Sequence, residues 1–246
     1  MICDDPRQYV GWTGQQWTNL EEASQHHRSE VREVEPGLWG VGVEPQFAIG
    51  QRGLIVTTPD GNVMWDVPGF VDDAAFERVR DLGGLAAISA SHPHFYGVMT
   101  EWANAFDAPV MLPNADREWV LRPTSSYEFY EDTAAPVPGV RLVRCGGHFP
   151  GSAVLHWEAG AGGAGALLTG DTITVVSDRD WISIMWSYPN LIPLDEATLR
   201  AVAARVESLR FDRIYGGWWG RVITSDARTR LAASLDRYIS MIGSPG

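Results

Sequence analysis

Two histidines separated by one residue are the side chains in this sequence best suited to bind a metal. His92 and His94 follow the apolar run Leu85–Ile88, which is typical of a buried strand. Two imidazoles in the loop after one strand can turn toward the same point, and such a pair begins a metal site. Because the chain has only 6 histidines, we interpret a pair at this position as functional.

Two further candidate ligands also lie at predicted strand ends. His148 stands in a loop rich in glycine and proline, residues 146–152, and Asp171 ends the predicted strand 166–171. Three imidazoles with a carboxylate or a water form a catalytic zinc site, and iron or manganese accept the same donors. A bound Zn²⁺ lowers the pKa of its water to about 7 and polarises a carbonyl or phosphoryl oxygen. We therefore predict that these four side chains hold a divalent metal, with zinc favoured over iron or manganese.

The elements that must position these residues begin after a polar N-terminal segment. Residues 1–30 are predicted to form an arm with a short helix near 20–25, and residues 31–246 to form a single domain. Turn signals and alternating apolar residues then predict strands over 31–34, 38–43, 54–58, 63–66, 85–89 and 109–112. The helical periodicity predicts helices over 71–82, 96–106 and 114–121, the last with Asn114 as its N-cap. Residues 122–138 are predicted to form a loop.

The second half of the chain repeats this order of strands and helices. The predicted strands are 140–143, 153–157, 166–171 and 213–215, and the predicted helices are 194–209 and 224–242. Residues 159–165 are predicted to be a turn, and an aromatic loop follows residue 171. Two β-rich layers packed together with helices outside account for this order, which is an α+β architecture.

Composition excludes several classes of protein. The chain has 31 acidic and 19 basic residues and a net charge of −12, which disfavours binding to nucleic acid. No apolar run reaches the length of a membrane span, and the N-terminus lacks the apolar stretch of a secretory signal. The 2 cysteines, Cys3 and Cys145, make no disulfide framework. We therefore expect a cytoplasmic protein that acts on a small molecule, binds neither nucleic acid nor membrane, and could form a homodimer.

Three motifs in order resemble those of the metallo-β-lactamase-fold hydrolase superfamily. They are the apolar strand before His92-Pro93-His94, the element Gly147-His148-Phe149-Pro150-Gly151-Ser152, and the element Leu168-Thr169-Gly170-Asp171-Thr172. The resemblance covers roughly residues 31–220. It implies a four-layer αββα sandwich with metal at the sheet edges. It also implies that His92, His94 and His148 match the ligands of the first metal and Asp171 the residue that bridges two metals.

The sequence departs from the family pattern at the second metal. The family continues its first two histidines with x-Asp-His, whereas this chain has Phe95-Tyr96-Gly97. The family's last metal histidine follows a late strand, and the matching segment, residues 214–220, contains none. The resemblance therefore implies a divergent member with one metal. Asp171 is then either the fourth ligand or the acceptor of the proton from the attacking water.

Tyr96 occupies the position of the family's water-orienting aspartate. A phenol with a pKa of about 10 is a poor base at neutral pH. Its hydroxyl could instead act as an acid or donate a hydrogen bond to an oxyanion. The side chain could also simply pack in the core.

Aromatic residues after Asp171 and near the C-terminal strand are candidates for a substrate pocket. The chain has 11 tryptophans, and large flat side chains bind apolar ligands. The predicted substrate-binding residues are Trp181, Trp186, Tyr188, Trp218 and Trp219. The leading hypothesis is hydrolysis of an ester, thioester, lactone or related bond in a fairly apolar small molecule. The alternatives are a non-catalytic binding protein on this fold and a one-metal enzyme of non-hydrolytic chemistry.

Overall fold

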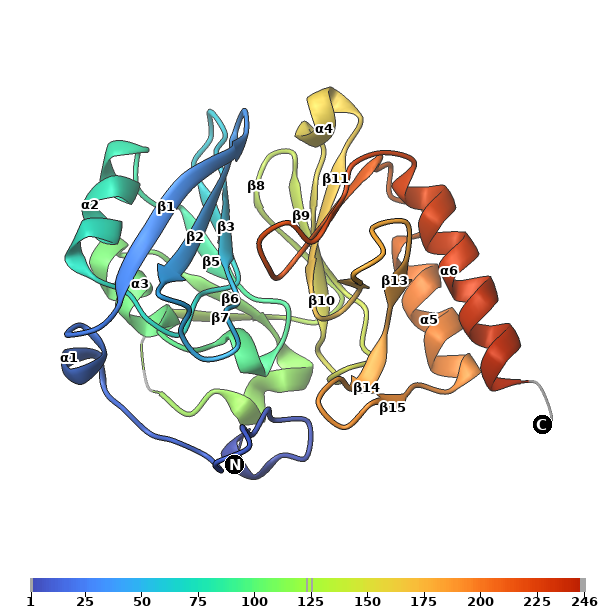
Figure 1. Cartoon of the computed structure of the whole chain (residues 1–246). Coiled ribbons are helices and arrows are strands. Elements are labelled where there is room, and N and C mark those ends of the chain that lie inside the picture. Colours follow the sequence, from blue (N-terminus) through green and yellow to red (C-terminus); the bar gives the residue numbers. More distant parts are fainter. Residues whose placement is uncertain (1, 123, 125, 244–246) are drawn as a thin grey trace.

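Two β-sheets pack face to face, with helices on both outer faces, in the computed structural model of the protein (Figure 1). The structure describes residues 2–122, 124 and 126–243. Helices α2 (Asp73–Asp81) and α3 (Met99–Phe106) cover the first sheet, and α5 (Glu196–Val206) and α6 (Ala227–Ile242) cover the second. This is the four-layer αββα sandwich that the sequence motifs imply.

The first half of the chain builds a seven-stranded sheet in the order β1-β2-β3-β4-β5-β6-β7. Strands β1 to β4 pair antiparallel, and β4 to β7 pair parallel. The strands are β1 (Arg28–Glu35), β2 (Leu38–Glu44), β3 (Gly53–Val56), β4 (Val63–Trp65), β5 (Ala87–Ser89), β6 (Val110–Pro113) and β7 (Tyr127–Tyr130). The remaining helical segments of this half are η1 (Ile2–Asp4), α1 (Leu20–Ala23), η2 (Pro93–Phe95) and η3 (Asn114–Trp119).

The second half builds a six-stranded sheet in the order β17-β16-β11-β10-β9-β8, in which only β11 and β16 pair parallel. Its strands are β8 (Thr133–Val137), β9 (Val140–Arg144), β10 (Ala153–Trp157), β11 (Ala166–Gly170), β16 (Arg213–Gly216) and β17 (Val222–Ile223). Two small hairpins lie between β11 and α5 in the chain, one formed by β12 (Thr174–Val175) with β13 (Ile182–Ser183), the other by β14 (Met185–Ser187) with β15 (Ile192–Pro193). The short α4 (Gly160–Gly163) joins β10 to β11.

Alternation along the buried strands supplies the three apolar layers of the sandwich. In β3, Leu54 and Val56 face the second sheet, whereas Ile55 faces α2 and α3. In β11, Leu168 faces the first sheet and Leu167 faces α5 and α6. Because both faces of these strands are covered, they read as continuous apolar runs rather than as polar–apolar alternation.

Several predicted elements differ from the structure; among them, the aromatic loop predicted after residue 171 contains the short strands β12 to β15. The predicted loop 122–138 is wrong in part, because β7 and β8 lie in it as edge strands with exposed or half-buried polar residues that hide the strand pattern. Asn114 is not an N-cap: it is the first residue of η3, and Pro113 precedes it without a side-chain cap. The helix predicted over 96–106 begins only at Met99, since the histidine segment first forms the 3₁₀ turn η2.

The N-terminal segment contains the predicted short helix, as α1, and β1 starts at Arg28. The division into an arm of residues 1–30 and a domain of residues 31–246 stays a prediction. No helix in the described part of the chain is both long and apolar enough to span a bilayer.

Candidate metal centre

The ends of the two sheets meet at Ser91, the residue before the first histidine. Its N–H donates to Asp66 Oδ1 at 2.6 Å, and its carbonyl accepts from the Ala153 N–H of β10 at 2.8 Å. Gly170, at the end of β11, approaches it so closely that a Cβ there would lie 2.1 Å from Ser91 Oγ. Gly170 also has a φ of +52°, in the left-handed region that favours glycine. The close approach of β5 and β11 brings the next residues, His92 and Asp171, together.

His92, His94 and His148 form a group that could hold a metal ion. One ring nitrogen of each lies within 4.8 Å of the other two. His92 and His148 are fully buried, and His94 is half-buried at the mouth of a cavity. The Nε2 atoms of all three are buried without any hydrogen-bond partner. Buried polar atoms almost always have a partner, so three that converge without one indicate a missing common ligand.

The opposite ring nitrogens of two of these histidines are held by the protein. The Nδ1 of His148 lies 2.8 Å from the Trp186 carbonyl and 3.1 Å from that of Met185, so Nδ1 must carry the proton. The Nδ1 of His92 lies 2.9 Å from Ser91 Oγ. Such second partners of metal-binding histidines fix the tautomer and aim the lone pair of Nε2 at the metal.

All three imidazoles are neutral at physiological pH. Burial is the main cause: it lowers the pKa of His94 to about 3 and that of His148 to about 4, and it holds that of His92 well below its ordinary value. Mutual repulsion among the rings lowers the pKa of His92 and His94 further. Neutral imidazole is the form that binds a metal, so the donor set fits a borderline divalent ion such as zinc.

The loop that carries His148 is closed on itself. The N–H groups of Cys145 and Gly146 both donate to the Ser152 carbonyl, at 2.7 and 2.9 Å. The Ser152 hydroxyl oxygen accepts from the Phe149 N–H at 2.8 Å. These bonds fold residues 145–152 into a compact turn that presents His148 to the other two histidines.

Asp171 lies beside the three histidines rather than among them. Its Oδ2 is 3.8 Å from His92 Nε2, while its Oδ1 accepts a hydrogen bond from the Thr174 hydroxyl at 2.8 Å. Burial raises the pKa of Asp171 to about 7, partly offset by the bond from Thr174. A carboxyl with this pKa can both accept and return a proton near neutral pH.

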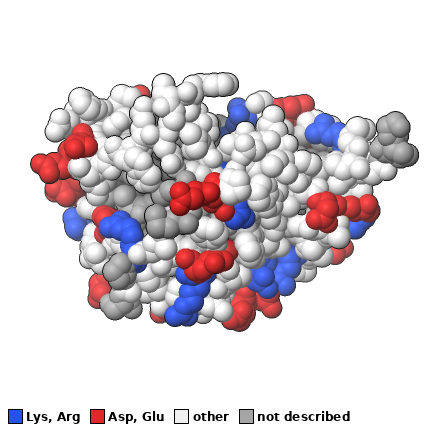
Figure 2. Space-filling model, turned by 90° about the horizontal axis from the view of Figure 1, so that it is seen from below, with Lys and Arg blue, Asp and Glu red and all other residues white. Residues whose placement is uncertain are grey.

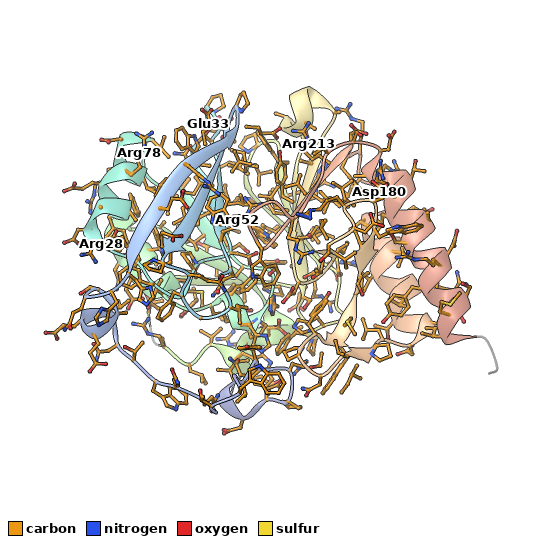
Figure 3. All side chains as sticks on the ribbon, viewed as in Figure 1. Arg28, Glu33, Arg52, Arg78, Asp180 and Arg213 are labelled. Carbon is orange, nitrogen blue, oxygen red and sulfur yellow. The ribbon has the colours of Figure 1, made fainter. Side chains whose placement is uncertain are left out.

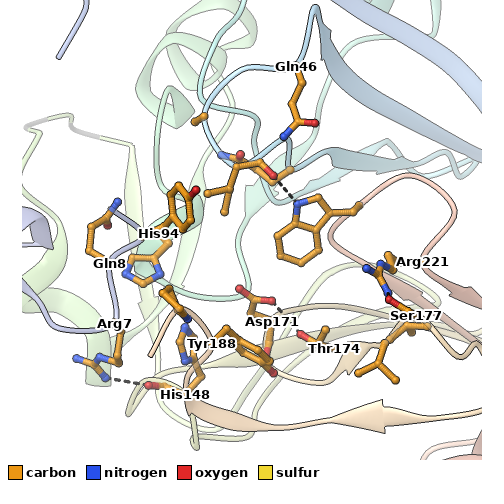
Figure 4. Close-up of a pocket in the computed structure, with 18 residues that line it drawn as sticks. Arg7, Gln8, Gln46, His94, His148, Asp171, Thr174, Ser177, Tyr188 and Arg221 are labelled. Carbon is orange, nitrogen blue, oxygen red and sulfur yellow. Dashed lines mark hydrogen bonds between the residues drawn. The ribbon is translucent and has the colours of Figure 1, made fainter. Parts of the chain in front are cut away.

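A cavity of about 790 Å³ opens over His94, His148 and Asp171 (Figure 4). Tyr188 and Trp218, two of the predicted substrate-binding residues, line it. The Tyr188 hydroxyl donates to the Asp171 backbone carbonyl at 2.8 Å, and the Trp218 indole N–H donates to the Ile49 carbonyl at 2.8 Å. These two rings are therefore fixed as walls of the cavity.

The other predicted aromatic residues lie outside the lining of this cavity. Trp181 stacks under the Arg237 guanidinium, and Trp186 packs against the core beneath α5 and α6. Trp219 lies flat on β2, where a Cβ at Gly40 would meet its ring at 2.3 Å. Tyr96 belongs to the core under α2 and α3, with a buried hydroxyl that has no hydrogen-bond partner. Burial raises its pKa well above the ordinary value.

The N-terminal arm contributes residues to the site that the sequence motifs did not indicate. Arg7, Gln8 and Tyr9 line the cavity. Arg7 is 9% exposed, its guanidinium stacks 3.6 Å from the Phe149 ring centroid, and its Nη1 donates to the His148 carbonyl at 2.8 Å. Its Nε and Nη2 donate to the carboxylate of Asp5 at 2.8 and 2.7 Å. The spacing of Asp5 and Arg7 was the one local signal, and it does not reveal a contact 141 residues away.

No family model matches the chain. It is 42% identical over 247 residues to the uncharacterized protein YmaE of Bacillus subtilis strain 168, and the aligned region covers 99% of this chain and 90% of YmaE. The structure is similar to that of the metallo-β-lactamase DIM-1, with a TM-score of 0.63 and 13% identity over 85% of this chain and 97% of that one. It is also similar to a B3 metallo-β-lactamase with an active-site glutamic acid, with a TM-score of 0.58 and 17% identity over 98% of this chain and 100% of the other. The chain therefore has the fold of the metallo-β-lactamases and belongs to the family of YmaE.

Proposed function

We propose that this protein is a hydrolase that uses one divalent metal, with zinc favoured, to cleave an ester, thioester, lactone or related bond of a small, mainly apolar molecule. The observation that carries the proposal is the convergence of three neutral, buried Nε2 atoms that have no partner in the protein. His92, His94 and His148 would hold the metal. When bound, it would supply a Lewis acid that polarises the carbonyl and lowers the pKa of the attacking water.

The residues around the histidines would transfer the proton of the attacking water and hold the metal ligands in place. Asp171 reaches the metal-facing side of His92, so its Oδ2 can accept the proton of the attacking water and deliver it to the leaving group. Thr174 holds the other carboxylate oxygen and thereby fixes the orientation of Asp171. The cation of Arg7 lies behind His148 and fixes the loop that carries this ligand. Tyr96 has no part in this scheme, because its hydroxyl lies in the core.

Two observations support a single metal. Among the described residues, the one group of three or more metal-binding side chains within reach of one another is the histidine triad. The segment that would carry the last histidine of a second site instead places Trp218 in the cavity wall, held by Ile49. An indole N–H only donates hydrogen bonds and cannot bind a metal.

The cavity supports an apolar small molecule as the substrate. Beyond the histidines its walls include Ala48, Ile49, Val175, Pro189 and Trp218.

We also propose that the protein acts in the cytoplasm without a nucleic-acid or membrane partner; a homodimer stays a prediction. On the face shown in Figure 2, acidic and basic side chains are interspersed, and no continuous basic surface is present for a phosphate backbone.

Metal analysis and ester hydrolysis together test the proposed function. Protein purified without added metal, then titrated with zinc, should bind about one equivalent, and the zinc-loaded protein should hydrolyse p-nitrophenyl esters or thioesters faster than metal-free protein. Protein that takes up no zinc would overturn the proposal. Zinc uptake without hydrolysis of any ester, thioester or lactone would favour the binding protein. Purification with iron, and turnover without incorporation of water, would favour non-hydrolytic chemistry.

A further inference from the structure

The cavity continues well past the metal centre. Figure 4 shows His94 and His148 at one end, Asp171 between, and Arg221 with Ser177 at the opposite end. Between the two ends, the lining includes the apolar side chains of Ile49, Val175 and Trp218, and Gln46 adds a polar amide. A ligand that reacts at the histidines and is longer than its reacting group must therefore extend toward Arg221.

Among the described residues, two arginines line the cavity, and Arg221 is the one that forms no ion pair with an acid. Its Nη1 donates to Ser177 Oγ at 3.0 Å, and no carboxylate of the described residues forms an ion pair with it. Arg7, the other arginine of the lining, has Asp5 as its partner. The chain contains no lysine. One guanidinium at the far end thus keeps donors free for a ligand.

The backbone of Arg221 is held in place even though its side chain is half-buried. Its carbonyl accepts from the Gly216 N–H at 2.9 Å, and its N–H donates to the Trp218 carbonyl at 3.1 Å. The turn between β16 and β17 therefore fixes the backbone position from which the Arg221 side chain extends. Such anchoring lowers the entropy lost when the side chain binds a ligand.

The charge of the cavity contrasts with that of the whole chain. The protein carries a net charge of −12, yet of the described residues that line the cavity only Asp171 is acidic, and its Oδ2 lies 3.8 Å from His92 Nε2. The far end therefore combines apolar walls with one positive charge. This combination suits a ligand with an apolar body and one anionic group.

We propose that the substrate carries a carboxylate at the end remote from the scissile bond, and that Arg221 binds it. The planar fork of a guanidinium matches a carboxylate in a two-point hydrogen bond. A single arginine neutralises a monoanion, whereas a phosphate dianion would require further cations. The inference rests on the proposed function for the position of the scissile bond, but the anion site itself does not depend on hydrolysis.

Paired ester substrates test the role of Arg221. The zinc-loaded protein is assayed with p-nitrophenyl monoesters of linear dicarboxylic acids, from succinic to suberic, and with the neutral esters of the matching monocarboxylic acids. Arg221→Ala should raise KM for the best carboxylated ester by about 10- to 100-fold, with kcat little changed, and leave the neutral esters unaffected. Arg221→Gln, which can keep a hydrogen bond to Ser177, should show the same loss and guards against a folding defect.

Arg179→Ala is the matched control. Arg179 is exposed and bonds to the Gly220 and Ser177 carbonyls of the same two loops, but it does not line the cavity. The Arg179→Ala substitution removes the same charge as Arg221→Ala and should leave the KM for both classes of ester unchanged. The proposal would be overturned if Arg221→Ala and Arg179→Ala raised the KM for the carboxylated ester equally. It would also be overturned if Arg221→Ala left the preference for carboxylated over neutral esters unchanged.

A binding measurement separates this inference from the proposed function. Calorimetric titration of metal-free protein with monomethyl suberate should show binding that Arg221→Ala abolishes and Arg179→Ala keeps. If no ester is hydrolysed but this binding occurs, the anion site stands and the hydrolase proposal fails. If esters are hydrolysed but the binding does not depend on Arg221, the hydrolase proposal stands and the anion site fails.

Discussion

The two ends of the cavity are built in different ways. At the metal end, three side chains are held by hydrogen bonds: His148 by the Trp186 carbonyl, His92 by Ser91, and Arg7 by Asp5. Both sheets contribute to this end, and its histidines are buried or nearly so. At the far end, Arg221 makes one side-chain hydrogen bond to Ser177, an exposed residue of a surface loop.

This difference separates reaction from recognition. Binding a metal requires several ligands to be fixed within fractions of an ångström, which packed strand ends and second partners achieve. Recognising one end of a substrate tolerates loops, and loops on a rigid scaffold can change without loss of the fold. We therefore expect changes at the metal end to abolish metal binding, and changes at the far end to alter which substrate is used.

The largest expected effect is the loss of one histidine. His94→Ala removes one of three donors but leaves the fully buried His92 and His148 in place, so the fold should persist. Removal of a hydrogen-bond partner of a metal ligand lowers metal affinity by up to about 100-fold. Loss of the ligand itself should lower zinc affinity by more than this, and hydrolysis should fall with it. Competition with a chromophoric chelator measures the affinity.

His156→Gln is the control for this substitution. His156 is also buried, but its ring bonds to the Arg210 carbonyl at 2.8 Å and lies outside the triad. Glutamine can replace this bond, so zinc affinity should stay within about twofold of the original. Equal losses in both variants would show that the triad is not the zinc site.

The next largest effect concerns the contact between the sheets. Gly170→Ala would place a Cβ 2.1 Å from Ser91 Oγ and 2.8 Å from Asp66 Oδ2, at a φ of +52°. The dihedral alone costs about 1–2 kcal/mol, and the clash adds about 1–3 kcal/mol of overpacking. Urea unfolding should therefore show a loss of about 2–5 kcal/mol.

Gly162→Ala separates the dihedral cost from the clash. Gly162 has a φ of +64°, and a Cβ there would meet no atom within 4 Å. It should lose only the dihedral part, about 1–2 kcal/mol. If the two variants lose the same stability, close approach at Gly170 is not what joins the two sheets at the metal end.

The metal end could be predicted from the sequence because its signals are local. An apolar run that ends in His92 and His94, a glycine-rich loop around His148, and Asp171 after a strand each stand within a few residues of the element that positions them. Buried strands that end at one edge of a layered fold bring such residues together. The three apolar layers follow from the same strands, since residues such as Ile55 and Leu167 are covered on both faces.

What could not be predicted depends on contacts between distant segments. Nothing near Arg7 shows that it stacks on Phe149, because the arm is polar and has no periodicity. The edge strand β8 contains Pro136 and alternates weakly, so its segment is typical of a loop. Among the aromatic residues, composition cannot tell Trp218, which lines the cavity, from Trp219, which covers β2. Both tryptophans lie in the turn between β16 and β17, where no strand alternation assigns either ring to a face, so the fold of the turn decides which ring faces the site.

A smaller effect is expected from Arg7, which links the arm to the metal end. Arg7→Ala removes the hydrogen bond to the His148 carbonyl and the cation over Phe149. Zinc affinity should fall by about 10- to 100-fold, as it does when an outer partner of a metal ligand is lost. Arg28→Ala is the matched control, because the Arg28 side chain, at the start of β1 (Figure 3), donates to the nearby Ser24 and His27 carbonyls; its loss should leave zinc affinity unchanged. An unchanged affinity in Arg7→Ala would mean that the arm covers the site without positioning its ligand.

The smallest effect concerns a buried carboxyl beneath the loop that carries His148. Asp116 Oδ1 accepts from the Gly151 N–H at 2.7 Å, while Oδ2 is buried without a partner. Burial raises the pKa of Asp116 to about 6. Because the folded pKa is above the unfolded value, the favourable contribution is complete below pH about 4 and is lost as the pH rises through 6.

Asp116→Asn keeps an oxygen for Gly151 and removes this titration. Relative to the original protein, it should gain about 1–3 kcal/mol between pH 4.5 and pH 8, as measured by urea unfolding at each pH. The exposed Asp132 provides a control of opposite sign, because hydrogen bonds and ion pairs from Arg144 and Arg205 lower its pKa. Asp132→Asn should therefore lose a little stability at pH 8 and none at the lowest pH. A constant difference across the pH range for Asp116→Asn would show that the metal end tolerates this buried carboxylate without an electrostatic cost.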